Sequence, residues 1–181
     1  MAPNYNYISE ISMSKMSWNL KVRVVRLWHV PDGEKPENSN SIELIIQDEK
    51  RDRIHATIRR VVMHIFKTKI HEMRLYVMKN FVVEPNNLKI KTNKHKVKLT
   101  FSHRTNVYEI SDPQFNLNIF NFKPYEHLTN QLAVDENELF DVIGEVISHG
   151  NVESYDQGGK PSTFMNLKLE DHEYACNHEL N

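Results

Sequence analysis

Hydrophobic and polar residues alternate along the first half of the chain in short runs that predict β-strands. The alternation is clearest at residues 20–28 and recurs at residues 41–47 and 53–58. A period of two is typical of a strand that buries one face. Residues 31–40 are rich in turn-forming residues and predict a loop. Residues 48–52 make so short a turn that the strands on either side are expected to pair as a hairpin.

The period changes after the third strand. Val62, Ile65, Phe66 and Ile70 recur near helical spacing, which predicts a helix over residues 60–72 with one apolar stripe. The stripe is best explained as a core-packing face.

Strand patterns resume at residues 75–78 and 81–83, and again at residues 97–101 after a long basic loop. Three strands, a helix and two further strands are the order of an OB-fold barrel, in which the helix closes one end. The predicted fold class is therefore all-β. We expect a five-stranded OB-fold barrel over residues 18–110, with one helix between strands 3 and 4.

The remaining sequence predicts three further segments. Residues 1–17 are an N-terminal extension, and residues 111–137 are a connector whose aromatic residues should hold it against the barrel: Phe115, Phe120, Phe122 and Tyr125. Residues 138–181 predict the truncated start of a second OB-fold. A strand at residues 140–147 and another at residues 164–169 would restart the pattern.

Charge divides the chain into two unlike parts. Residues 1–110 carry 20 Lys and Arg against 11 Asp and Glu, whereas residues 111–181 carry 3 against 13. The basic part suggests a polyanionic partner, although an ordinary solvated surface explains the charge equally well. The single cysteine, Cys176, cannot form an internal disulfide, and this fits a reducing compartment. Every apolar run is shorter than a membrane span, so no membrane partner is expected.

The candidate binding residues follow from the predicted fold. OB barrels bind ligands on the face of strands 2 and 3 and in the adjoining loops. The loop before the fifth strand, with the start of that strand, supplies a cluster of basic residues: Lys89, Lys91, Lys94, His95, Lys96 and Lys98. Phosphates favour such a cluster through counterion release, and the alternative is a solvated hairpin loop.

Four residues of the predicted strands complete the candidate site. Trp28 ends the first strand, where it could stack on a base or close the end of the core. Arg26 shares that strand. Arg59 follows the third strand and is either a base-stacking or phosphate-binding group or a surface charge. His55 points away from Ile54 and Ala56, towards a ligand or towards solvent.

Catalytic patterns are weak. The sequence contains neither a glycine-rich phosphate loop nor a nucleophile elbow. His172 and His178 flank Cys176, but three ligands on one terminal segment indicate coincidence rather than a zinc site. We therefore expect a binding protein and not an enzyme, with no cofactor, metal or small-molecule substrate.

Several sequence segments together resemble a known family. They are residues 18–28 (WNLKVRVVRLW), 45–49 (IIQDE), 54–57 (IHAT), 88–90 (LKI) and 140–145 (FDVIGE). In this order and spacing, the chain resembles the large subunit of replication protein A in its plant-type forms.

The resemblance implies a function and a set of contacts. In that family, the first of two tandem OB domains binds single-stranded DNA during replication, repair and recombination in the nucleus, beside other replication protein A subunits. Trp28 matches an aromatic contact, Lys89 a basic contact, and His55 a position that often holds a DNA-binding arginine. Arg59 and His95 replace two stacking phenylalanines, so binding should be weak and strongly dependent on salt.

Three alternatives remain from the sequence. The barrel could be a protein-interaction module, an RNA binder, or a remnant of a longer DNA-binding protein. The acidic C-terminal segment could also compete with DNA for the basic loop, in which case deleting residues 138–181 would tighten DNA binding.

Overall fold

The computed structural model divides into two compact units. One unit comprises Met1–Ile119 with Asn137–Leu139, and the other comprises Phe120–Glu136 with Phe140–Asn181. The residues that the structure describes are 4–15, 17–88, 91–115, 118–120, 122–123, 139–156, 158–159, 161–171 and 174–180. None of the helices among these residues has the length and hydropathy needed to cross a membrane.

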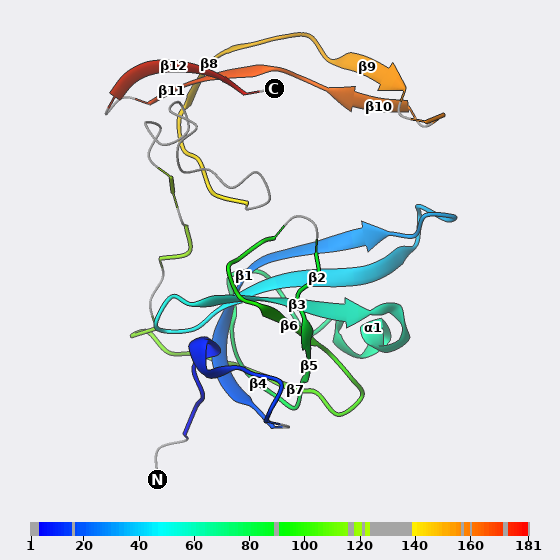
Figure 1. Cartoon of the computed structure of the whole chain (residues 1–181), viewed down its shortest axis with the longest axis vertical. Coiled ribbons are helices and arrows are strands. Elements are labelled where there is room, and N and C mark those ends of the chain that lie inside the picture. Colours follow the sequence, from blue (N-terminus) through cyan, green and yellow to red (C-terminus); the bar gives the residue numbers. More distant parts are fainter. Residues whose placement is uncertain are drawn as a thin grey trace. The chain divides into compact units, whose positions relative to one another are not determined.

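A curled seven-stranded sheet and one α-helix build the first unit (Figure 1). In chain order the elements are β1 (Asn19–Pro31), β2 (Ser39–Gln47), β3 (Arg53–Arg59), α1 (Arg60–Phe66), β4 (Leu75–Lys79), β5 (Val82–Pro85), β6 (Val97–Thr100) and β7 (Asn106–Ile110). The strand order across the sheet is β5-β6-β3-β2-β1-β4-β7. All neighbouring strands are antiparallel except β3 and β6, which run parallel.

The sheet curls into a barrel because one strand changes partner at a corner. β4 pairs with β1 and β5 pairs with β6, yet only Asn80 and Phe81 separate β4 from β5. Asn80 has a φ of 62°, a left-handed conformation that asparagine tolerates better than most residues. The Thr105 hydroxyl donates a hydrogen bond of 2.9 Å to the Asn80 carbonyl. With β4 and β5 counted as one bent strand, β1, β2, β3, β4–β5 and β6 form the predicted five-stranded OB-fold, and β7 is a sixth strand paired with β4.

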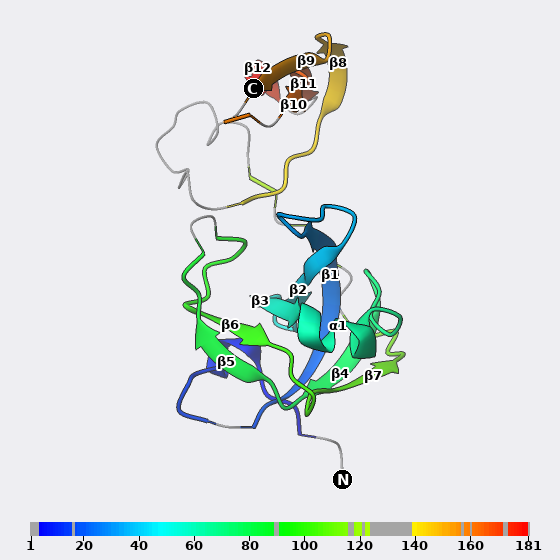
Figure 2. The same ribbon diagram turned by 90° about the vertical axis from the view of Figure 1, so that its right-hand side faces the viewer.

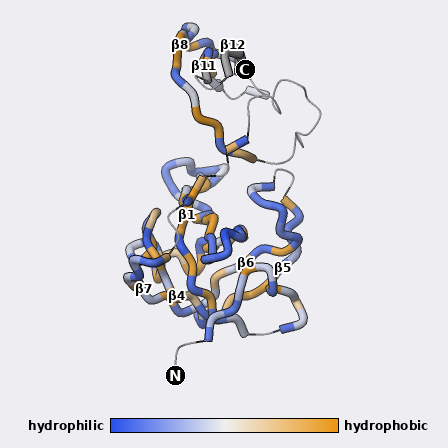
Figure 3. The backbone as a smooth tube through the Cα atoms, turned by 90° about the vertical axis from the view of Figure 1, so that its left-hand side faces the viewer, coloured by the Kyte–Doolittle hydropathy of each residue, from blue (hydrophilic) through white to orange (hydrophobic). Residues whose placement is uncertain are grey.

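Alternation along the strands fills the core of this barrel. In β2, Ile42, Leu44 and Ile46 are at most 2% exposed, and the inward side chains of β3 are equally buried. Figure 3 shows the hydrophobic residues concentrated along the strands and a largely hydrophilic loop between β5 and β6. The segment expected to be an N-terminal extension adds to this core, because Ile8 and Ile11 pack in it.

The helix is shorter than its sequence pattern predicts. It ends at Phe66, and the Lys69 amide then donates to the Phe66 carbonyl at 2.9 Å in a tight turn. Ile70 is nevertheless only 3% exposed, because the turn rather than a further helical turn carries it into the core. A helical spacing of apolar residues therefore overestimated the helix by about two turns. Strand β7 was not predicted as a separate element.

The second unit contains two small sheets. Its strands are β8 (Glu145–His149), β9 (Glu153–Asp156), β10 (Pro161–Phe164), β11 (Leu167–Asp171) and β12 (Tyr174–Leu180). A three-stranded sheet has the order β12-β11-β8, and β9 pairs with β10. The sequence predicted two strands here. The predicted second strand, residues 164–169, spans the end of β10 and the start of β11, and β12 is an additional strand.

The connector is partly packed against the barrel. Phe115 is 3% exposed and Ile119 is 5% exposed, as anchors should be. Phe120 and Phe122, expected to be anchors too, are each 44% exposed. Tyr125 lies outside the described residues.

Candidate nucleic-acid interface

The outer face of β1, β2 and β3 is polar and follows from the alternation that builds the core. Leu44 points into the barrel, so Glu43 on one side of it points outward. The strand register then aligns Trp28 with Glu43, Glu43 with Thr57, and Thr57 with Thr100 of β6. A row of side chains therefore crosses four strands on this face. A second row aligns Arg26 of β1, Ile45 of β2 and His55 of β3.

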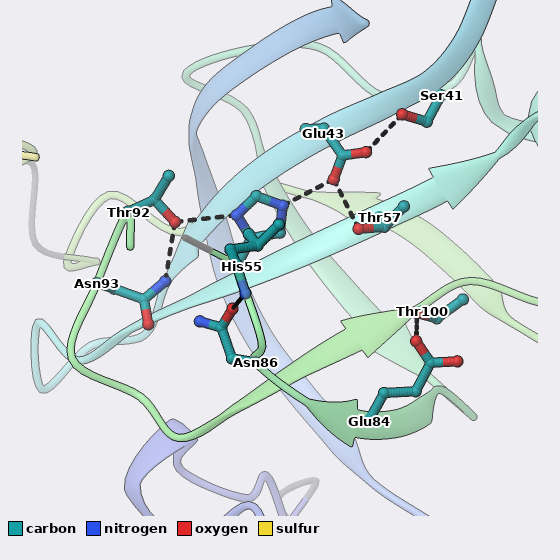
Figure 4. A network of polar contacts seen from close by, with 10 residues as sticks. Ser41, Glu43, His55, Thr57, Glu84, Asn86, Thr92, Asn93 and Thr100 are labelled. Atoms are coloured by element: carbon teal, nitrogen blue, oxygen red, sulfur yellow. Dashed lines mark hydrogen bonds and ion pairs between the residues drawn. The ribbon is translucent and has the colours of Figure 1, made fainter. Parts of the chain in front are cut away.

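Glu43 is the centre of a hydrogen-bond network on this face (Figure 4). Its Oε2 accepts hydrogen bonds from His55 Nε2 at 2.7 Å and from the Thr57 hydroxyl at 2.6 Å. Its Oε1 accepts one from the Ser41 hydroxyl at 2.5 Å. Charge-assisted hydrogen bonds of this kind fix both the carboxylate and its donors in place.

The network also sets the ionisation of Glu43. Burial alone would raise the pKa of this carboxyl, because a charge is poorly solvated there. The hydrogen bonds from His55, Ser41 and Thr57 outweigh burial and hold the pKa of Glu43 below its ordinary value. Glu43 therefore stays ionised at neutral pH, with both of its carboxylate oxygens occupied by protein donors.

His55 is buried rather than exposed. Only 2% of the residue is accessible, and its Nδ1 lies 2.9 Å from the Thr92 hydroxyl, while Nε2 binds Glu43. Both ring nitrogens are thus used by the protein in this arrangement. The solvent-exposed alternative considered for His55 is wrong, because the loop that carries Thr92 covers it. A direct contact between His55 and DNA stays a prediction.

The loop between β5 and β6 is tied down at several points. At its base the Asn86 amide donates to the Lys96 carbonyl at 2.9 Å, and the His95 amide donates to Asn93 Oδ1 at 2.9 Å. Thr92 then joins its middle to β3 through His55. Figure 2 shows this loop and the β1–β2 hairpin projecting towards the same end of the barrel. The described parts of this loop, residues 86–88 and 91–96, are therefore held by the protein before any ligand arrives, which lowers the entropy cost of binding.

This loop presents lysines to solvent. Lys91, Lys94 and Lys96 are exposed, whereas Lys98 in β6 is half-buried. Lys89 lies outside the described residues. The structure thus brings three of the five predicted lysines together on one anchored loop.

His95 is directed towards the N-terminal segment. The Val97 amide donates to His95 Nδ1 at 3.3 Å, so Nε2 carries the proton and donates to the Ile8 carbonyl at 3.0 Å. The ring serves to hold the base of the loop in this arrangement, and its predicted stacking on a base stays untested.

Trp28 and Arg59 are the exposed flat side chains of this face. Trp28 is 36% exposed and meets His55 edge-on, with ring centroids 5.7 Å apart and planes at 85°. The Arg59 side chain is 58% exposed, and its Nη2 lies 3.0 Å from each carboxylate oxygen of Glu84. The Thr100 hydroxyl donates to the same carboxylate at 2.9 Å. Arg26 is half-buried, and its Nη1 donates to the Val25 carbonyl at 2.9 Å.

Sequence reasoning missed the residues that organise this face. Glu43 and Thr57 lie at outward positions of predicted strands, so their alternation could have indicated them. Thr92 gave no such signal, because its contact with His55 spans 37 residues. No cluster of three or more His, Cys, Asp or Glu residues suited to a metal ion occurs within the described parts of the chain.

The fold is similar to those of proteins whose structures are known. A protein of a replication protein A heterotrimer, solved bound to single-stranded DNA, superposes with a TM-score of 0.65 at 19% identity. The match covers 97% of this chain but only 41% of that one, so this chain spans less than half the length of its structural relative. DNA-binding domain A of S. cerevisiae replication protein A gives a TM-score of 0.44 at 18% identity, covering 61% of this chain and 96% of that domain.

Two comparisons of the sequence itself give different results. No curated protein matches the sequence. The family model described as a domain of unknown function, DUF223, matches residues 9–131, which include the whole barrel and most of the connector. The chain therefore belongs to the DUF223 family, and the member described here has an OB-fold.

Proposed function

We propose that the first unit binds single-stranded DNA across the outer face of β1, β2 and β3. The observation that carries this proposal is the arrangement on that face of exposed Trp28 and Arg59 beside an anchored loop with exposed lysines. Flat side chains stack on bases of any sequence, and cations compensate the phosphates. Double-stranded DNA keeps its bases stacked inside, so a stacking site selects single strands.

The state of the acidic side chains supports the same proposal. Glu43 is held by three protein donors, and Glu84 is held by Arg59 and Thr100. Arg59 must share its guanidinium between Glu84 and a nucleotide. Affinity should therefore depend strongly on the loop lysines and so on salt concentration.

The structural relative supports a more specific role. Its protein is a replication protein A subunit solved with single-stranded DNA, and its backbone matches nearly the whole of this chain. We infer that this chain acts as a non-enzymatic DNA-binding module in the nucleus, in replication, repair or recombination, beside other replication protein A subunits.

The test is a titration of labelled oligo-dT at low and physiological salt, with oligo-rU and duplex DNA as competitors. We expect saturable binding that prefers oligo-dT and weakens about 5- to 150-fold in Trp28→Ala, the range of one lost base stack. Lys89→Ala should weaken it as well. Tyr108→Ala is the matched control, because Tyr108 is 56% exposed on β7, at the far end of the strand order from β5.

Two results would contradict the proposal. Absence of oligo-dT binding at low salt would favour the protein-interaction or remnant alternative. Tighter binding of oligo-rU than of oligo-dT would favour an RNA ligand.

A further inference from the structure

Two phenylalanine rings of the connector form an exposed stacked pair. The ring centroids of Phe120 and Phe122 are 5.0 Å apart with an angle of 12° between the planes, and each residue is 44% exposed. Burial drives aromatic residues into cores, so a stacked pair left accessible to solvent is unusual and indicates a binding role. The described residues hold other exposed aromatics, but Phe120 and Phe122 are the two that follow in the chain directly after a segment packed on the candidate DNA-binding face.

That packing is specific. Ile119 is buried against Val25 and Ile45, and Ile45 belongs to the same cross-strand row as Arg26 and His55. The side-chain amide of Gln47 donates to the Asn118 carbonyl at 2.8 Å, and Arg53 donates to the Ile119 carbonyl. Residues 118–119 are therefore fixed where β2 ends and β3 begins, four residues along β2 from the partner of Trp28.

The position of residues 118–119 suggests the direction in which a bound single strand would run across the face. Trp28 aligns with Glu43, and the anchor is held by Gln47, four residues further along β2. Four strand residues span about 13 Å. A single strand that stacks on Trp28 and runs along β2 towards Gln47 would leave the barrel where the chain itself leaves it.

We propose that Phe120 and Phe122 form a second base-stacking site, which takes one or more nucleotides of the same single strand beyond those held by the barrel. This inference rests on the proposed DNA binding of the barrel. Phe120 follows Ile119 directly, so a single peptide bond connects the pair to residues 118–119, which are fixed on the barrel. The second contact is then intramolecular once the barrel is occupied, and a short tether gives it a high effective concentration. Lys123, next in the chain after Phe122, supplies a cation for the accompanying phosphate.

The geometry of the pair favours nucleobases over a protein ligand. The planes of the two stacked rings are nearly parallel, which suits the addition of a further flat ring. The anchor beside them is built from Gln47 and Arg53 at the edge of a face that already carries exposed Trp28.

The experiment compares oligonucleotides of increasing length, from dT6 to dT20, on the full chain. In the wild type, affinity should rise with length and then reach a plateau. The variant Phe120→Leu with Phe122→Leu keeps the apolar character but removes the ring faces. We expect it to bind the shortest oligonucleotide within about twofold of wild type and the longer ones at least about fivefold more weakly, the effect of one lost stack.

Two matched variants complete the design. Phe120→Tyr with Phe122→Tyr retains the rings and should restore the dependence on length. Tyr108→Leu removes a more exposed aromatic ring from β7 and should leave the binding of both short and long oligonucleotides unaffected. Crosslinking with 5-iodouracil placed along a long oligonucleotide should map to Phe120 or Phe122 by mass spectrometry.

The outcomes separate this inference from the function on which it rests. If the leucine variant binds every length as the wild type does, the stacking site is wrong while DNA binding by the barrel stands. An equal loss at all lengths would also overturn it, because the pair would then act through the barrel. Failure of the wild type to bind any oligonucleotide would overturn both the stacking site and DNA binding by the barrel.

Discussion

Strands β2 and β8 both contain aliphatic residues but lie in opposite environments. In β2, Ile42, Leu44 and Ile46 are at most 2% exposed. In β8, every residue is exposed, with Val146 at 52% and Ile147 at 39%. The difference lies in what faces the strand, since the sheet of the first unit curls at Asn80 and closes over β2. Alternation thus determines which residues share a face, whereas burial requires a second layer.

Substitution in the two sheets should sharpen this contrast most strongly. Leu44→Ala removes a fully buried side chain and should lower the free energy of unfolding by about 2–5 kcal/mol. Val146→Ala removes an exposed one and should change it by about 0.5 kcal/mol or less. Urea unfolding followed by tryptophan fluorescence reports the first unit, because Trp18 and Trp28 both lie there. Amide hydrogen exchange reports β8, and equal effects at both positions would contradict the comparison.

The polar network of the first unit should give the next largest effect. Glu43→Gln replaces a charged acceptor of three hydrogen bonds and should cost about 1–3 kcal/mol of stability at pH 7. Because folding lowers the pKa of Glu43, its contribution is present above the ordinary value of 4.5 and is lost as pH falls through the lower folded value. The stability difference between wild type and Glu43→Gln should therefore shrink between pH 7 and pH 3 in urea titrations. A constant difference would show that the charge of Glu43 is not involved.

Charge distinguishes the two units in DNA binding. Each loop lysine that contacts a phosphate contributes about 0.7 to the slope of log affinity against log salt. Lys94→Gln with Lys96→Gln should therefore reduce that slope by about 1.4. Lys168→Gln, in β11 of the acidic second unit, should leave it unchanged. Titrations of oligo-dT at four or more salt concentrations measure the slopes, and a similar loss from Lys168→Gln would show that DNA also contacts the sheet that contains β11.

The smallest expected effect is the change in stability when Arg59 is replaced in the protein without DNA. Its contact with Glu84 is solvent-exposed, so Arg59→Ala should reduce the free energy of unfolding by less than about 1 kcal/mol. The same variant should weaken oligonucleotide binding, because it removes a stacking and phosphate-binding group. A large loss of stability would instead show that Arg59 holds the barrel together.

The sequence predicted the local parts of this molecule better than its long-range ones. Alternation located β2 and β3 within two residues, whereas Trp28, which was predicted to end the first strand, lies three residues before the end of β1. It overestimated helix α1, because Ile70 reaches the core through a turn. Local period cannot distinguish these two routes into a core.

The burial of His55 illustrates a long-range feature that the sequence did not predict. Its outward direction followed from the strand period, but the loop that covers it comes from residues 86–96. The contact with Thr92 depends on how a distant loop folds back, and no pattern within a strand reports that. Lysine spacing likewise indicated the loop charge but not the hydrogen bonds of Asn86 and Asn93 that hold the loop.

The parallel pairing of β3 with β6 has a kinetic consequence. Ala56 aligns with Leu99 and Thr57 with Thr100, so this edge of the barrel joins residues more than forty positions apart. Contacts of such separation form slowly, because the chain between them must first be ordered. During synthesis β1, β2 and β3 emerge first. The backbone groups of β3 that pair with β6, at Ala56 and Thr57, stay unpaired until β6 has been synthesised. A nascent chain therefore exposes the edge of its own candidate binding sheet to other strands, and this interval is its period of greatest risk of misassembly.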